Sequence, residues 1–126
     1  MKWGENMRRH ILTVGIRDSL RNALESTAQR DKIQIVSSPS IKTAVQLLAQ
    51  QRFAVILVDL ELFVRVAPDF PYGSGRQSPY VIVLGNAGTK YAHRVEDDAN
   101  LFLSYQIPLS KLWSHIMKAL SLRIGD

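Results

Sequence analysis

Short apolar runs alternate with amphipathic stretches along the whole chain. Three runs, at residues 10–14, 53–58 and 81–84, are apolar at nearly every position, which is typical of strands covered on both faces of a parallel sheet. Two weaker runs, at 33–36 and 101–103, are short or partly alternate with polar residues, as strands at a sheet edge do. The sequence therefore predicts five strands, of which the three most apolar lie in the middle of the sheet.

Helical periodicity fills most of the segments between these strands. Apolar residues return every three or four positions between 20 and 28, between 41 and 48, and between 109 and 122, which predicts three amphipathic helices. We expect Asp18 or Ser19 to cap the first helix, and the segment Ser37-Ser38-Pro39-Ser40 to form a turn and a cap before the second. The residues expected to face inward are Leu20, Ala23, Leu24, Thr27 and Ala28, then Ile41, Ala44, Val45, Leu47 and Leu48, and finally Leu112, Ile116, Met117 and Leu120.

Two segments between strands give a weaker helical signal. Residues 67–79 contain three prolines and two glycines, so we expect a loop there, with at most one or two helical turns after Leu60. Residues 89–99 fit a weak helix. Strands that alternate with helices are parallel and joined by right-handed crossovers. We therefore predict a single α/β domain over residues 1–126, with an N-terminal tail at 1–9. Its fold is predicted to be a flavodoxin-like (βα)5 doubly wound parallel sheet with the strand order 2-1-3-4-5. The third helix of this fold is expected to be short or degraded.

Composition narrows the class of protein further. The 126 residues include no cysteine, which excludes disulfides, a cysteine nucleophile and thiolate metal sites. No apolar run approaches the roughly 20 residues of a membrane span, and residues 1–6 lack the apolar stretch of a secretory signal, so we expect a cytoplasmic protein without membrane contact. The net charge is +5, but the basic residues are dispersed, so direct nucleic-acid binding is not expected.

Asp59 is the main candidate in this sequence for a residue with a chemical role. It directly follows the apolar segment 55–58, and ligands of a doubly wound sheet bind at the carboxyl ends of its central strands. A carboxylate at such a strand end is poorly hydrated and needs a partner. By physical chemistry alone, Asp59 is equally interpreted as a cap on the loop that follows. The ends of the other two central strands lie at the same edge and consist of Gly15, Ile16, Arg17, Gly85 and Asn86.

These features resemble the receiver domain of two-component response regulators over residues 10–123. The segment 11–14 resembles the family's first strand, and Ala44-Val45-Gln46-Leu47-Leu48 is similar to its helix before the third strand. The strand that ends in Asp59 resembles the one that carries the family's phospho-accepting aspartate. The later segments 81–84 and 101–103 resemble the fourth and fifth strands. The resemblance implies a signalling domain in which Asp59 has the position of the phosphoryl acceptor.

The chain departs from the family's phosphorylation site at several positions. Where the family has two acidic residues that hold Mg²⁺, this chain has Gly15 and Ile16, followed by Arg17. The family's Ser or Thr after the fourth strand corresponds to Gly85, and its lysine after the fifth strand to Tyr105. Phosphoryl transfer depends on a metal and a cation that neutralise charge. The resemblance therefore implies a vestigial acceptor aspartate and a phosphorylation-independent domain, with no metal, no other cofactor and no enzymatic activity expected.

The residues around Asp59 leave alternatives open. The guanidinium of Arg17 either pairs with Asp59 where the metal would have been, or points to solvent. A small anion or nucleotide could bind on the backbone amides of a loop after the fourth strand, which is otherwise a plain loop. That candidate anion loop contains Gly85, Asn86, Gly88, Thr89 and Lys90. An active phospho-receiver would instead need Glu61 or Asp18 as a substitute metal ligand.

A protein partner, or a second copy of the chain in a homodimer, is the expected ligand. By resemblance, the family's common contact face runs from the fourth helix through the fifth strand to the fifth helix. Here that face comprises Tyr91, Phe102, Tyr105, Lys111, Trp113 and His115. Trp113 is equally interpreted as a core residue beside Leu112, and Phe102 fits the core as well. Because receivers usually precede an output domain, we expect the chain either to stand alone or to be the N-terminal part of a longer regulator.

Overall fold

Five parallel strands form one sheet. The computed structural model describes residues 10–66, 79–86 and 99–124. Its sheet has the order β2-β1-β3-β4-β5, and each neighbouring pair of strands is parallel. The strands are β1 (His10–Val14), β2 (Gln34–Ser38), β3 (Val55–Asp59), β4 (Tyr80–Gly85) and β5 (Leu101–Ser104). The predicted architecture and strand order are confirmed.

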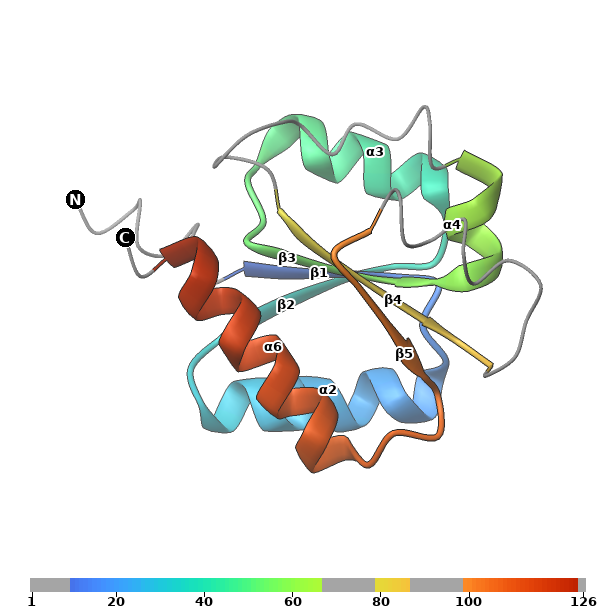
Figure 1. The fold of residues 1–126 in the computed structure, drawn as a ribbon. Coiled ribbons are helices and arrows are strands. Elements are labelled where there is room, and N and C mark those ends of the chain that lie inside the picture. The colour runs from blue at the N-terminus through green and yellow to red at the C-terminus, as the bar shows by residue number, and fades with distance from the viewer. Residues whose placement is uncertain (1–9, 67–78, 87–98, 125–126) are drawn as a thin grey trace.

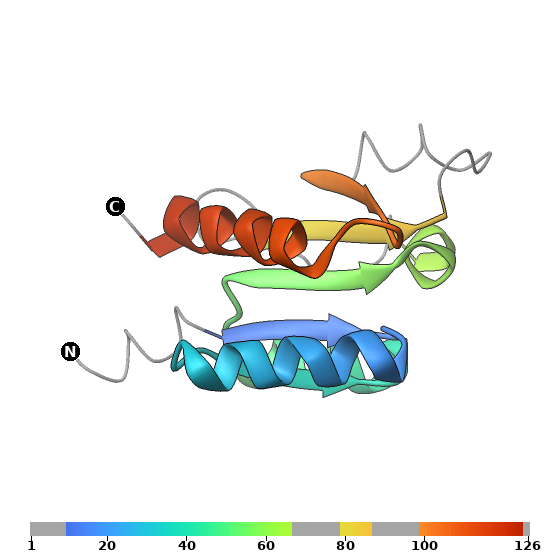
Figure 2. The ribbon, with the colours of Figure 1, turned by 90° about the horizontal axis from the view of Figure 1, so that it is seen from below.

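Helices cover both faces of this sheet (Figure 1). Helices α2 (Asp18–Arg30) and α6 (Leu109–Ile124) lie on one face, and α3 (Ile41–Gln50) and α4 (Leu60–Val66) lie on the other. Seen from the side of α2 and α6, these two helices run in the same direction (Figure 2). Within the described residues, the helix after β3 spans seven residues, which agrees with the one or two turns predicted after Leu60.

Two predicted segments, the weak helix at 89–99 and the Pro/Gly-rich loop at 67–79, lie almost wholly outside the described residues. Within the part of the chain that is described, no helix combines the length and the hydropathy that crossing a bilayer demands.

The core has two layers, one on each face of the sheet. Successive residues of a strand point to opposite faces, so Val55 and Leu57 pack under α2 and α6 while Ile56 and Val58 pack under α3 and α4. All four are 2% exposed or less. Burial on both faces explains why the central strands read as unbroken apolar runs.

The predicted N-terminal caps of the helices are confirmed only in part. Ser40 caps α3, where its Oγ accepts the Thr43 N–H at 3.2 Å. The predicted cap of α2 is wrong, because Arg17 occupies the cap position without a side-chain bond and Asp18 already lies inside the helix. An acidic residue in the first turn still interacts favourably with the helix dipole, so Asp18 contributes there in a different way.

Two residues that were expected to face inward do not. Val45 and Met117 are 38% and 39% exposed, whereas Trp113 is only 8% exposed. On α6 the inward stripe therefore includes Trp113 instead of Met117.

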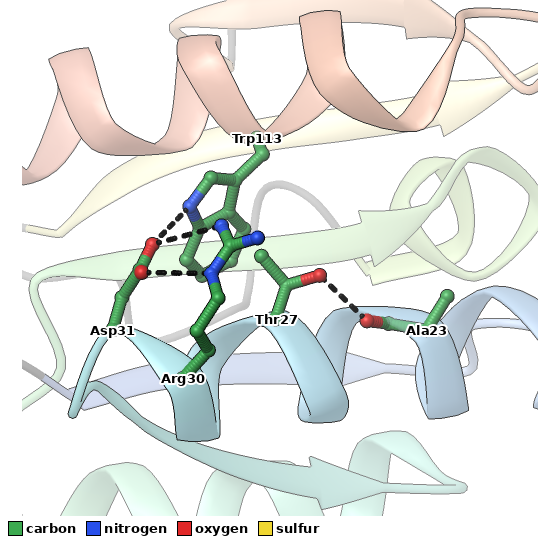
Figure 3. Close-up of polar contacts among 5 residues, drawn as sticks. All are labelled: Ala23, Thr27, Arg30, Asp31 and Trp113. Carbon is green, nitrogen blue, oxygen red and sulfur yellow. Dashed lines mark hydrogen bonds and ion pairs between the residues drawn. The ribbon is translucent and has the colours of Figure 1, made fainter.

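Trp113 connects α6 to the end of α2 (Figure 3). Its Nε1–H donates to Asp31 Oδ2 at 2.8 Å, and Arg30 Nε donates to Asp31 Oδ1 at 3.1 Å. The hydrogen bond from Arg30, followed by that from Trp113, lowers the pKa of the Asp31 carboxyl. This contact decides between the two interpretations of Trp113: it is a core residue that faces α2, and it is not part of an exposed partner face.

Candidate functional site

A hollow of about 230 Å³ opens at the carboxyl ends of the central strands. Asp59 is the last residue of β3, Gly85 is the last residue of β4, and Tyr105 directly follows β5. The residues that line the hollow are Arg17, Asp59, Leu60, Glu61, Gly85, Asn86 and Tyr105. The parallel topology thus brings Asp59 together with three of the predicted pocket residues, which are Arg17, Gly85 and Tyr105.

The carboxylate of Asp59 accepts a hydrogen bond at each oxygen. The Tyr105 hydroxyl donates to Oδ1, and the Glu61 backbone N–H donates to Oδ2 at 3.0 Å. Burial of the phenol and its contact with the Asp59 carboxylate raise the pKa of Tyr105. Tyr105 therefore remains a protonated, neutral donor to Asp59 at any physiological pH.

Arg17 contacts the site through the ring of Tyr105. Its guanidinium carbon lies 4.3 Å from the centre of that ring, within the range of a cation–π interaction. The described residues form no ion pair between Arg17 and Asp59. Of the two alternatives, the pairing with Asp59 is not observed: Arg17 is exposed and stacks on the residue that holds Asp59.

The end of β1 offers no room for a carboxylate. Gly15 has a φ of +68°, and a Cβ placed there would lie 2.3 Å from Leu62 Cδ1. An L-amino acid is strained at such a φ, so an acid at this position would require both a backbone change and a displaced leucine. Ile16 is 6% exposed and packs in the core under α2 and α6, so its predicted place in the pocket is wrong.

Gly85 is enclosed by apolar side chains. A Cβ at this position would lie 2.7 Å and 2.8 Å from Leu60 Cδ2 and Cβ, and 3.1 Å from Phe102 Cε1. Phe102 itself packs against the core on the α3 and α4 face, which agrees with its interpretation as a core residue. A serine or threonine at 85 would therefore collide with Leu60 before its hydroxyl could reach the hollow.

The oxygen donors at this site do not fit the Mg²⁺ of a receiver. Mg²⁺ needs nearly octahedral oxygen ligation, whereas both oxygens of Asp59 are engaged and a guanidinium lies nearby. Asp18, which was considered as a substitute ligand, does not line the hollow and pairs with Arg21 at 3.2 Å. Across the described segments, no three His, Asp or Glu side chains come together as a metal site would require.

The charges around the hollow also weaken the case for an anion. Two acidic side chains, Asp59 and Glu61, and one basic side chain, Arg17, line it, and a net negative lining repels an anion. Gly85 and Asn86 of the candidate anion loop do line the hollow. Gly88, Thr89 and Lys90 lie outside the described residues, so that part of the loop stays a prediction.

The predicted partner face is not continuous in the described part of the structure. Tyr105 faces Asp59, Trp113 faces α2, and Phe102 packs on the core. Lys111 is exposed and His115 is half-buried on α6, while Tyr91 is not among the described residues. Leu60 lines the hollow but was not expected there from the sequence, and its position directly after Asp59 was the available signal.

Comparison with known proteins supports the fold. No protein-family model matches the chain, and no curated protein matches it in sequence. The solved receiver domain dimer of NtrC4, activated with beryllofluoride, is 17% identical, covers 90% of this chain and 97% of its own, and has a TM-score of 0.74. A receiver domain of an HD domain-containing protein from Pseudomonas fluorescens Pf-5 is 16% identical over 92% of this chain and 89% of its own, with a TM-score of 0.73.

A pseudo-receiver is also among the similar structures. The pseudo-receiver domain of the CikA protein is 17% identical, covers 87% of this chain and 95% of its own, and has a TM-score of 0.61. At these identities the similarity concerns the fold. The chain therefore has the receiver fold.

Proposed function

We propose that this domain is a receiver-like signalling module that works through protein–protein contacts and is not switched by phosphorylation of Asp59. The observation that carries the proposal is the hydrogen bond from the Tyr105 hydroxyl to Asp59. By the resemblance, position 105 is where a phospho-receiver has its lysine. Here a neutral phenol takes that place and donates a hydrogen bond to one of the two carboxylate oxygens.

The charge balance around Asp59 opposes phosphoryl transfer. The transferred group carries negative charge on its oxygens, and enzymes stabilise that charge with metal ions and cations. A phosphoryl group on Asp59 would instead meet the Glu61 carboxylate and a neutral phenol, while the cation of Arg17 lies on the Tyr105 ring. The added charge would therefore have little compensation.

A fixed site suits a module whose binding surface is always presented. The contacts of Asp59 and Arg17 with Tyr105 connect the ends of β1, β3 and β5 without a phosphoryl group. We infer that the domain recognises protein partners, including a second copy of itself, in a two-component or related cytoplasmic signalling pathway. We assign it no catalytic role. An output domain, such as one that regulates transcription, would belong to the partner or to another part of a longer regulator.

The direct test is an attempt to load Asp59. The protein is incubated with Mg²⁺ and acetyl phosphate, and separately with Mg²⁺ and beryllofluoride, and examined by intact mass and by amide NMR. We expect an unchanged mass and no shift of the amides near Asp59. Asp59→Asn is the control for modification elsewhere. Stoichiometric modification of the wild type that is absent from this variant would overturn the proposal.

A second variant separates the phenol from the other missing parts. Tyr105→Lys supplies the family's cation but leaves Gly15 and Gly85 unchanged. We expect it to remain unmodified by acetyl phosphate, because the metal ligands are still missing. Efficient modification of Tyr105→Lys would mean that Tyr105 alone keeps the site inactive.

A further inference from the structure

We propose that two copies of this domain associate through the outer surfaces of α2 and α6, with an acidic stripe on α2 of each copy facing a basic stripe on α6 of the other. The basic stripe is Lys111, His115, Lys118 and Leu122. The acidic stripe is Asp18, Asn22, Glu25 and Gln29. The inference rests on the proposed function only in that the domain acts by binding protein, and it names the surface that is used.

The basic stripe on α6 has no counter-charge within the described residues. Its members are spaced at i, i+4, i+7 and i+11, so they lie along one side of the helix. Lys111 and Lys118 are exposed, and Leu122 is 51% exposed. Residues 99–124 contain no acid, and neither the Arg21–Asp18 pair nor the Arg30–Asp31 pair involves a residue of this stripe. A surface with unpaired cations and an exposed leucine is suited to an acidic helix of the same periodicity.

The acidic stripe on α2 has that periodicity. Its four residues follow the same i, i+4, i+7 and i+11 spacing, and all four are exposed. Asp18 pairs with Arg21, but its side chain is 83% exposed, and a surface pair of this kind is weak enough to exchange partners. Glu25 accepts the Ser37 hydroxyl through Oε2 at 3.1 Å, which positions the carboxylate and leaves Oε1 available.

The arrangement of the two helices allows both stripes to be used at once. α2 and α6 lie on the same face of the sheet and run in the same direction (Figure 2), and the Trp113–Asp31 hydrogen bond connects them. The two helices cross obliquely (Figure 1), and a two-fold axis that lies between them and bisects their directions places α2 of one copy opposite α6 of the other. Because such an interface is isologous, the acidic–basic contact is made twice. The exposed side chain of Met117 on α6 adds apolar area.

The experiment measures the oligomeric state by light scattering and sedimentation over a range of protein and salt concentrations. We expect a dimer that weakens as salt rises, because exposed charge pairs are screened. One variant reverses the basic stripe, with Lys111→Glu and Lys118→Glu. The other reverses the acidic charges, with Asp18→Lys and Glu25→Lys. We expect either variant alone to associate about tenfold more weakly or worse.

Mixing the two variants is the decisive step. In the mixed pair, each helix again faces a helix of opposite charge at both contacts, so we expect a heterodimer of about wild-type affinity. The control matched to the basic-stripe variant is Lys42→Glu with Arg65→Glu, which makes the same change in net charge as that variant, but on α3 and α4 at the other face, and should leave the dimer unchanged. Circular dichroism of every variant checks that it is folded.

Three outcomes would overturn this inference: a monomeric wild type at all concentrations, reversed variants that dimerise as before, or a mixture that fails to pair. These outcomes are distinct from failure of the proposed function. A monomer that acetyl phosphate leaves unmodified refutes only the dimer, whereas a dimer whose Asp59 is phosphorylated refutes only phosphorylation independence.

Discussion

Replacing Gly85 by serine would give this chain the residue type that receivers have after their fourth strand. The site around Gly85 leaves too little space for that side chain. Its first atom would lie 2.7 Å from Leu60 Cδ2 and 2.8 Å from Leu60 Cβ, whereas comfortable contacts between carbon atoms are about 3.5–4.0 Å. Leu60 Cβ is fixed to the backbone, so a change of rotamer cannot relieve the second contact. We therefore expect Gly85→Ser to destabilise the fold.

The size of the loss follows from two opposing contributions. Overpacking a close-packed site costs typically about 1–3 kcal/mol, and this contact belongs at the upper end because it involves a backbone-fixed atom. Gly85 lies in β4 outside the left-handed region, so losing the freedom of glycine in the unfolded chain returns about 0.4–1 kcal/mol. We expect the free energy of unfolding to fall by about 2 kcal/mol.

Urea unfolding followed by circular dichroism measures this change. Gly85→Ala is the matched variant, because it adds the colliding Cβ without the hydroxyl, and it should lose about as much stability as Gly85→Ser. Leu60→Ala, at a side chain that is 3% exposed, should cost about 2–5 kcal/mol alone. The combined Leu60→Ala and Gly85→Ala variant should lose less than the sum of the single losses. If Gly85→Ala were as stable as the wild type, the glycine would have no packing role and our account of the missing hydroxyl would fail.

Further substitutions test the contacts of the site and of the helix pair. Tyr105→Phe keeps the ring beneath Arg17 but removes the hydrogen bond to the Asp59 carboxylate, so we expect the free energy of urea unfolding to fall by about 1 kcal/mol. Because the folded state raises the pKa of Tyr105, the wild type should also lose stability as the pH rises above about 10. Tyr105→Phe should not show that loss at high pH. Trp113→Ala removes a buried indole and should cost about 3–5 kcal/mol, measured by thermal unfolding. The hydrogen bond from Arg30, and to a smaller extent that from Trp113, lowers the pKa of Asp31. The ionised carboxylate therefore contributes to stability above about pH 4, and this contribution is lost as the pH falls further. If Asp31→Asn unfolded in acid at the same pH as the wild type, Asp31 would make no such contribution.

Much of the fold was predictable because the sheet imposes simple demands on its strands. A central parallel strand is buried on both faces, so 55–58 could be recognised from its unbroken apolar run. Helix starts were less predictable, because an aspartate is favoured both at the cap and in the first turn, and Asp18 takes the second role. The choice between Trp113 and Met117 as the inward residue depends on Asp31, which is 82 positions away in the sequence. Helical periodicity alone contains no information about that contact.

In the candidate site too, the positions of the strand ends were predictable from the sequence, whereas the side-chain contacts were not. The carboxyl ends of parallel strands meet at one edge, so the sequence could bring Asp59, Gly85 and Tyr105 together. It could not predict that Arg17 stacks on a ring, because a long side chain near an acid and an aromatic residue has several comparable partners. Ile16 was misplaced because the positive φ of Gly15 ends the alternation of β1 and turns the next side chain into the core.

The burial of α6 side chains in the same cluster as α2 has a consequence during biosynthesis. A nascent chain that has emerged only as far as residue 108 contains α2 and its strands but lacks α6, whose side chains Leu112 and Ile116 share a buried cluster with Leu24. Such a translation intermediate exposes the part of this apolar cluster that α6 covers in the complete fold, and exposed apolar surface of this kind favours aggregation. We expect ribosome-bound chains stalled at this length to be sensitive to protease, and chains extended past α6 to become resistant.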